Sequence, residues 1–193
     1  WTPNYYPEGC PPASSVSMHF DATEKNNSRI QMTWYDGGIK PFHPELLPDN
    51  VDIEPNGVFM IGDKGVITCD AYGEKPTLYV KGEAAVTGEK VRIDEPEFGH
   101  QRQWVDACKA GFNSTEHLSL TSSFDYSGPL TETVLMGNIA IRSYMLREEN
   151  SQGRVEFVGR KKLLWDGDSM KIKNLETANQ FVGRTYRKGW ELT

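Results

Sequence analysis

The stretch that decides the fold is Gly99–Arg147, GHQRQWVDACKAGFNSTEHLSLTSSFDYSGPLTETVLMGNIAIRSYMLR. Its second half carries the strongest periodic signal in the chain, because apolar residues recur there at steps of three and four. The members of this stripe are Leu130, Val134, Gly137, Ile141 and Met145, widened by Leu135, Ile139 and Tyr144. The spacing predicts an amphipathic helix from Pro129 to Arg147 that buries the stripe. Pro129 suits the first helical position, and Glu132 in the first turn lies near the positive end of the helix dipole.

A shorter helix is predicted immediately before it, from Gly99 to Gly111. His100, Trp104 and Cys108 would share one side of this helix, and Gly111 suits a left-handed cap at its end. Most of the remaining chain has the pattern of strands. Because two helices with one-sided apolar faces need a surface to pack on, we expect a sheet that carries helices on one face.

Four strands are indicated by the first half of the chain. Strict alternation over residues 15–20 and 30–35 predicts two half-buried strands, paired antiparallel across the polar loop 21–28. Residues 57–70 predict a tight hairpin with Asp63-Lys64 at its tip. The strands of this hairpin are continuous apolar runs, so we expect them to lie deeper in the sheet than the first pair.

The later elements complete an α+β fold. They are strands at residues 77–80, 90–93, 154–159 and 161–166, and a short helix at residues 175–183. The sequence therefore predicts one sheet that carries the helices on one face. We expect a leading segment, residues 1–14, followed by a single domain over residues 15–193.

Composition excludes several classes of function. The 193 residues carry a net charge of −6 and include no apolar run of membrane-spanning length, so neither nucleic acid nor a membrane is an expected partner. The sequence contains no glycine-rich dinucleotide motif and no P-loop. Its histidines do not have the spacing of metal ligands; they are His19, His43, His100 and His117. The three cysteines, Cys10, Cys69 and Cys108, are interpreted as small buried apolar residues, with one disulfide involving Cys10 left open.

Two aromatic clusters are the candidate ligand-binding sites. Trp34, Tyr35 and Asp36 end a predicted strand before a Gly-Gly turn, and Tyr72 lies in a second cluster. A rigid aromatic ring beside a carboxylate is a common way to hold a sugar, although it is also a common way to finish a strand. Asp166 and Asp168 resemble a catalytic carboxylate pair, but an Asp-Gly turn is the favoured interpretation.

Six segments, in this order, resemble one known family. They are QMTWYDGGIKP (31–41), GVFMIGDKGVITCDAYGEKP (57–76), GHQRQWVDACKAG (99–111), SSFDYSGPLTETVLMGNIAIR (122–142), KKLLWDGDSMKIKN (161–174) and ANQFVGRTYRKGWEL (178–192). Together they are similar to the C-terminal domain of the bacterial glucose–fructose oxidoreductase/inositol dehydrogenase (Gfo/Idh/MocA) family. The resemblance covers the chain from about residue 15 to its end.

The resemblance implies a two-domain oxidoreductase that uses NAD or NADP and acts on a sugar or cyclitol. An N-terminal Rossmann domain of the same protein would bind the cofactor. The C-terminal domain would have an α+β, dihydrodipicolinate-reductase-like fold, an open, mostly antiparallel sheet with helices packed on one face. It would contribute to the substrate cleft and to oligomer contacts. The family's catalytic lysine belongs to a Glu-Lys-Pro motif in the Rossmann domain, so Glu74-Lys75-Pro76 here is interpreted as coincidence. Its Asp-x-x-x-His motif does not occur, so we assign no catalytic or cofactor-binding residue to this chain.

The sequence therefore predicts a substrate-binding and oligomerisation domain cut from a longer oxidoreductase and inactive alone. Its expected partners are the Rossmann domain, a sugar, and a second copy of the chain that contacts it through the open sheet face. The bacterial cytoplasm and periplasm are both left open as compartments. A stand-alone carbohydrate-binding or scaffold module is the main alternative, and a hydrolase using Asp36 or the Asp166/Asp168 pair is a weaker one.

Overall fold

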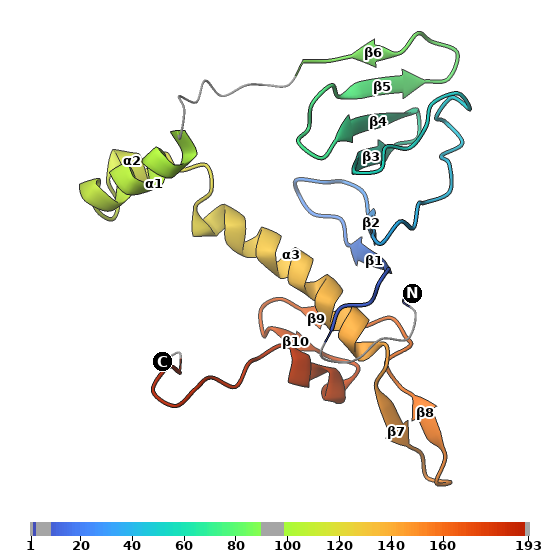
Figure 1. Ribbon diagram of the computed structural model, residues 1–193, viewed down its shortest axis with the longest axis vertical. Helices are drawn as coiled ribbons and strands as arrows, with labels where there is room; N and C mark the ends of the chain where they lie inside the picture. Colours follow the sequence, from blue (N-terminus) through green and yellow to red (C-terminus); the bar gives the residue numbers. More distant parts are fainter. Residues whose placement is uncertain (1, 3–8, 90–98, 192–193) are drawn as a thin grey trace. The chain divides into compact units, whose positions relative to one another are not determined.

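The computed structural model describes residue 2 and residues 9–89 and 99–191, and it confirms the α+β class (Figure 1). Helices and strands make up 24% and 23% of the structure, and the strand pairs are antiparallel. In chain order the elements are β1 (Ser15–Phe20), β2 (Ile30–Tyr35), β3 (Gly57–Ile61), β4 (Gly65–Asp70), β5 (Thr77–Val80), β6 (Val86–Thr87), α1 (Gly99–Ala110), α2 (Thr115–Leu118), α3 (Phe124–Ser143), β7 (Arg147–Glu149), β8 (Val155–Phe157), β9 (Trp165–Asp166), β10 (Lys171–Ile172) and the 3-10 helix η1 (Glu176–Phe181).

The chain forms two compact units, which are described separately. The first unit combines residues 1–39 with residues 124–193, and the second unit is residues 40–123. In the described part of the chain the strands form separate small sheets, β1-β2, β3-β4-β5-β6, β7-β8 and β9-β10, and not the one open sheet that was expected. The dihydrodipicolinate-reductase-like arrangement stays a prediction.

The β1-β2 hairpin of the first unit has the predicted antiparallel pairing. Val16 lies opposite Trp34, Met18 opposite Met32 and Phe20 opposite Ile30, so the apolar residues of both strands share one face. This face is covered unevenly, because Val16 is buried whereas the Trp34 side chain is 59% exposed. Strand β1 contacts α3 (Figure 1), which explains why burial is concentrated on the β1 side.

Helix α3 begins at Phe124, five residues before the predicted start. Pro129 therefore lies inside the helix and not at its first position, and this part of the prediction is wrong. A proline there removes one hydrogen bond to the carbonyl group four residues earlier. That carbonyl belongs to Asp125, an exposed residue in the first turn, where water can hydrogen-bond to the freed group.

The buried face of α3 matches the predicted stripe at Ile139, one of the residues that widened it, and differs from it at Leu130 and Val134. Leu130 and Val134 are about half exposed, whereas Ile139 and Ser143 are the buried residues of the helix. Two positions along a helix correspond to a rotation of about 200°, so the face around Ile139 is nearly opposite the one around Ile141. Only the C-terminal half of α3 packs into the core of the first unit. The core consists of Ile139, Ile172, Leu175 and Ala178, with Leu146, Val158, Leu163, Trp165 and Val182 packed against it.

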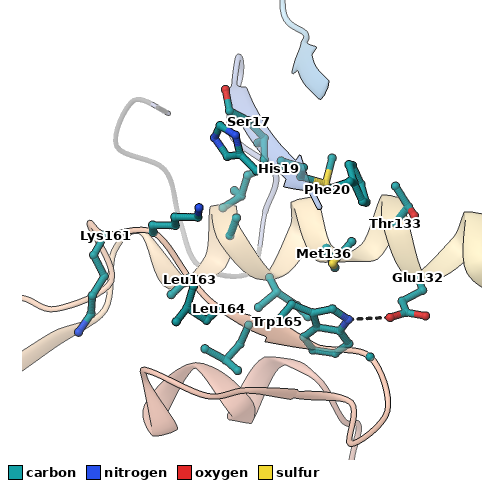
Figure 2. A pocket seen from close by; sticks show the side chains of 18 of the residues that line it. Ser17, His19, Phe20, Glu132, Thr133, Met136, Lys161, Leu163, Leu164 and Trp165 are labelled. Carbon is teal, nitrogen blue, oxygen red and sulfur yellow. Dashed lines mark hydrogen bonds between the residues drawn. The ribbon is translucent and has the colours of Figure 1, made fainter. Parts of the chain in front are cut away.

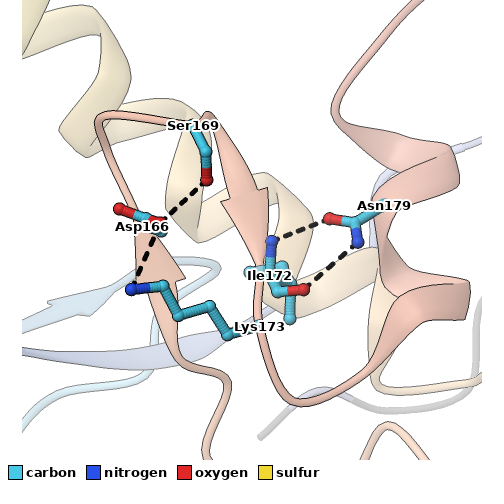
Figure 3. A network of polar contacts seen from close by, with 5 residues as sticks. All are labelled: Asp166, Ser169, Ile172, Lys173 and Asn179. Carbon is cyan, nitrogen blue, oxygen red and sulfur yellow. Dashed lines mark hydrogen bonds and ion pairs between the residues drawn. The ribbon is translucent and has the colours of Figure 1, made fainter.

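Asparagine side chains fix the chain after this helix. The Asn179 side chain accepts a hydrogen bond from the Ile172 N–H and donates one to the Ile172 carbonyl, at 2.7 and 3.1 Å (Figure 3). Asn174 bonds in the same way to Leu164 N–H and to the Lys162 carbonyl, both at 2.8 Å. The Asn174 bonds, together with a 2.8 Å backbone bond from Lys173 N–H to the Leu164 carbonyl, hold residues 162–164 beside β10.

The strand predicted at residues 154–159 is confirmed as β8, whose partner is β7 and not the following segment. Arginine side chains cover the aromatic ring of this hairpin. The Arg147 guanidinium lies 4.4 Å from the centre of the Phe157 ring, and the Arg160 guanidinium lies 3.4 Å from it. Cation–π contacts of this kind hold long cationic side chains in place.

The second unit contains the predicted hairpin 57–70 as β3 and β4, closed by a 2.9 Å bond from Gly62 N–H to the Gly65 carbonyl. Val66 is fully buried, but a row of apolar residues across the other face is exposed. The row consists of Met60, Ile67, Leu78 and Val86, which lie directly opposite one another in β3, β4, β5 and β6. The expectation that these strands lie deeper than β1 and β2 is therefore wrong. The strand predicted at residues 90–93 lies outside the described residues.

Helix α1 confirms the shorter predicted helix. Gly111 follows it with a φ of 92° and donates to the Ala107 carbonyl, as expected of a left-handed cap. Trp104 on the predicted apolar side is exposed, and Ala107 is buried instead. The three cysteines are unpaired in the structure; Cys10 and Cys108 are exposed, so the buried interpretation is wrong for both.

Candidate functional site

A cleft of about 1050 Å³ lies within the first unit, between β1, α3 and residues 159–165 (Figure 2). The sites of small ligands in proteins typically have volumes of about 300–1,000 Å³. Met136, Ile139, Leu163 and Ile172 give the cleft an apolar part. The cleft is therefore about as large as the larger ligand sites and has both apolar and polar side chains in its lining.

Glu132 and Trp165 form the hydrogen bond that joins two walls of the cleft. The Trp165 indole Nε1–H donates to Glu132 Oε1 at 2.6 Å, and neither side chain is fully exposed (Figure 2). An indole can only donate, whereas an ionised carboxylate accepts through both of its oxygens. The bond therefore fixes the orientation of the Glu132 carboxylate and leaves acceptor capacity for hydroxyl groups of a ligand.

Gly167 explains why these two side chains can meet. A Cβ atom at this position would lie 3.0 Å from Glu132 Oε1, closer than carbon and oxygen normally approach. Glycine thus keeps room for the carboxylate beside the β9-β10 turn. Asn174, which holds Leu164 and Lys162, fixes the backbone that carries the Trp165 ring.

The rest of the lining is rich in cationic side chains. Arg160, Lys161 and Lys162 follow one another along one wall, and His19 lies on β1. Arg29, also in the lining, is paired with Asp21 at 3.0 Å in an exposed salt bridge. The cleft therefore combines one held carboxylate with several positive groups.

The residues predicted to bind a sugar lie elsewhere. Trp34 and Tyr35 are at the end of β2, and neither belongs to the lining of the cleft. The Asp36 carboxylate accepts hydrogen bonds from Ser14 N–H and from Ser14 Oγ, at 2.6 and 2.8 Å. Because Ser14 is fully buried, these bonds attach the segment before β1 to the end of β2. This contact gives Asp36 a structural role.

Tyr72 belongs to the second unit, on the turn between β4 and β5. Its side chain is 80% exposed, and its N–H donates to Asp70 Oδ1 at 2.9 Å. The same oxygen accepts from Glu74 N–H at 2.8 Å, so Asp70 organises the turn that contains Glu74-Lys75-Pro76. A role for Trp34, Tyr35, Asp36 or Tyr72 in binding a sugar stays a prediction.

Asp166 is the last residue of β9 and Asp168 lies in the turn that follows, which agrees with the favoured interpretation. Figure 3 shows the contacts of Asp166. The Asp166 carboxylate accepts from Ser169 Oγ at 2.8 Å and pairs with Lys173 Nζ at 3.2 Å. The hydrogen bond from Ser169, followed by the contact with Lys173, lowers the pKa of Asp166 below its ordinary value. These contacts use the carboxylate to close a turn.

In the described part of the chain, no group of three or more His, Cys, Asp or Glu side chains is placed to hold a metal ion. Among the same residues, no helix combines the length and the apolar character needed to cross a bilayer. His43 and His117 have local contacts instead: His43 Nε2 lies 2.9 Å from the Val51 carbonyl oxygen, and the His117 ring lies 4.9 Å from that of Phe112.

Reasoning from sequence missed Glu132 and Trp165 as site residues. The sequence predicts for Glu132 only a favourable interaction with the helix dipole, and for Trp165 only a position in a strand. The available signal was that each lies in a segment of the family resemblance, 122–142 and 161–174. Their contact spans 33 positions in the sequence, and no local pattern encodes it. In comparisons with known proteins, neither a protein-family model nor a curated protein matches the chain.

Proposed function

We propose that this chain is the substrate-binding and oligomerisation domain of an oxidoreductase that uses NAD or NADP and acts on a sugar or cyclitol. The cofactor and the catalytic residues would belong to a Rossmann domain of the same protein, and the chain alone would be catalytically incomplete. The cleft of the first unit is the proposed substrate site.

One observation carries the proposal. Two of the segments on which the family resemblance rests, 122–142 and 161–174, supply walls of the cleft and the hydrogen bond of Glu132 with Trp165 that joins them. Segments that resemble a sugar oxidoreductase thus meet at a cavity whose size suits one small molecule.

The chemistry of the lining supports a ligand rich in hydroxyl groups. A carboxylate that is already oriented accepts hydrogen bonds from hydroxyl groups without a further ordering cost, and charged acceptors make stronger bonds than neutral ones. Thr133 adds a hydroxyl group to the same wall, although its Oγ donates to the Pro129 carbonyl at 2.9 Å. The Trp165 ring and Met136 provide apolar surface for the carbon face of a sugar ring.

The proposal is tested by calorimetric titration of the chain with a panel of hexoses and cyclitols. We expect at least one to bind, and Glu132→Gln to weaken it about tenfold or more, as for a hydrogen bond to a charged group. Glutamine keeps an acceptor for Trp165, so the cleft should stay intact. Glu24→Gln is the matched control, because Glu24 is exposed in the same unit and outside the lining. Absence of binding by every member of the panel would refute the proposal.

An oligomer contact is part of the proposal, and the exposed row Met60, Ile67, Leu78 and Val86 supports it. An apolar row of this extent is poorly placed in water, and a second copy of the same sheet could cover it about a two-fold axis. Light scattering should then show a species larger than 21.8 kDa, and Ile67→Lys should dissociate it. A monomer at all concentrations would exclude the contact.

The stand-alone carbohydrate-binding module remains the alternative, and the gene that encodes the chain discriminates between the two. A strand-helix unit with a G-x-G-x-x-G motif encoded upstream of Trp1 would favour the oxidoreductase.

A further inference from the structure

Positive charge is concentrated on one wall of the cleft. The chain as a whole is acidic, with a net charge of −6, yet Arg160, Lys161 and Lys162 are consecutive and all belong to the lining. The other charged side chains of the lining are Asp21, Arg29 and Glu132, and Asp21 is paired with Arg29. Positive charge therefore exceeds negative charge in the lining, and the two lysines are adjacent on one wall.

The ammonium groups of Lys161 and Lys162 have no acidic partner within the described residues. The salt bridges found there are Arg29–Asp21 and Lys173–Asp166. Arg160 is turned away onto aromatic rings, since its guanidinium lies 3.4 Å from the centre of Phe157 and 4.8 Å from that of Tyr144. The lysines are thus the cations of this wall that remain available to a ligand.

The backbone under the lysines is held in place. Asn174 Nδ2 donates to the Lys162 carbonyl at 2.8 Å, and Asn174 Oδ1 accepts from Leu164 N–H at the same distance. Arg160 is fixed by its stacking on the other side. The fixed segment therefore places both lysines in the lining of the cleft, where their positive charges attract an anion.

The cleft is also polarised along its length. Figure 2 shows Lys161 at one end and the Glu132–Trp165 hydrogen bond at the other, with Leu163 and Leu164 in between. A ligand that spans the cleft would therefore meet a hydroxyl acceptor at one end and positive charge at the other.

We propose that the ligand of this cleft is an anionic sugar, one that carries a carboxylate or a phosphate group. The anionic group lies against Lys161 and Lys162, and the ring hydroxyls face Glu132. This inference rests on the proposed function and narrows its substrate class. Lysine is a common ligand of both kinds of anion, because its ammonium acts as a point charge with three donors.

The test is calorimetric titration of the full chain with D-glucuronate, D-glucose 6-phosphate, D-glucose and inorganic phosphate, at low and high ionic strength. We expect one or both anionic sugars to bind at least about tenfold more tightly than D-glucose, with a preference that decreases as salt is added. If D-glucuronate binds more tightly, the preferred anionic group is a carboxylate, and if D-glucose 6-phosphate binds more tightly, it is a phosphate.

A double variant assigns the effect to the lysines. Lys161→Gln with Lys162→Gln should abolish the preference for the anionic sugars over D-glucose. The matched control, Lys64→Gln with Lys81→Gln, removes the same charge from exposed positions of the second unit and should keep the preference. Far-UV circular dichroism checks that both variants are folded, and Lys161→Arg with Lys162→Arg should retain the preference.

The outcomes separate this inference from the proposed function. Equal binding of neutral and anionic sugars, or a preference that survives the double variant, overturns the inference while the sugar site stands. Inorganic phosphate that binds as tightly as the anionic sugars also overturns it, because the ring would then contribute nothing. Binding of no sugar at all, neutral or anionic, refutes both.

Discussion

The buried face of α3 makes a quantitative prediction about two residues of one helix. Ile139 is 7% exposed and packs in the core with Ile172, Leu175 and Ala178, whereas Val134, five positions earlier, is 55% exposed. Truncation of a buried isoleucine to alanine removes apolar contacts and leaves a cavity, which costs about 2–5 kcal/mol. A typical domain has a total stability of about 5–15 kcal/mol, so Ile139→Ala should be a severe change.

Val134→Ala is the matched control for the same helix. Its side chain loses little burial, and alanine has the higher helix propensity, so we expect a change within about 0.5 kcal/mol. Urea denaturation followed by circular dichroism measures both free energies of unfolding. The stripe expected from sequence predicts a large loss for Val134→Ala. Equal losses for the two variants, or a negligible one for Ile139→Ala, would refute the packing of α3 described above.

Two further predictions concern carboxylates that the structure gives local roles. Asp36→Ala should lower the free energy of unfolding of the first unit by about 1–3 kcal/mol, because Ser14 is buried and would lose its acceptor. The control Asp49→Ala, on an exposed loop, should change this free energy little, and equal urea midpoints for the two variants would contradict the prediction. The pKa of Asp166, measured by carboxyl NMR titration, should lie below 3.8 and should rise toward that value in Ser169→Ala. Ionised Asp166 therefore stabilises the fold at a pH above its unfolded-state pKa, and this stabilisation is lost as the pH falls through the lower folded-state pKa. An unchanged pKa in the variant would refute this role.

The elements that the sequence predicted correctly are those defined by local contacts. Alternation over 15–20 and 30–35 was enough to predict the antiparallel pairing of β1 with β2, and two glycines around Asp63-Lys64 identified the hairpin of the second unit. Gly111 marked the end of α1 because a left-handed residue follows the last turn of many helices. In each case the determining interactions join residues close in sequence.

The orientation of α3 could not be predicted in this way. The helix has apolar residues on more than one side, so its periodicity permits several buried faces, and the choice depends on β10 and η1, which supply Ile172 and Ala178 to the core. Pro129 misled the prediction of its start, because a proline at the first position and one in an exposed second turn leave similar sequence signals.

The candidate site was missed for a related reason. Aromatic residues followed by glycine at the end of β2 are conspicuous in the sequence and are therefore predicted as a candidate site. In the structure the Asp36 carboxylate beside them accepts hydrogen bonds from Ser14, which is a structural contact. Neither Glu132 nor Trp165 belongs to a recognisable local motif. They are identified as candidate site residues only by their hydrogen bond, which joins segments far apart in the chain.

The most direct test of the central claim is an NMR titration that follows the indole N–H signals of the tryptophans. The chain has five tryptophans, and substitution of Trp34 and Trp165 by phenylalanine, one at a time, assigns the two signals of interest. On addition of a sugar that binds, we predict that the Trp165 signal shifts most, because its N–H is bonded to Glu132 within the cleft, and that the Trp34 signal stays in place. A shift of Trp34 with no shift of Trp165 would contradict the account and return the binding site to the end of β2.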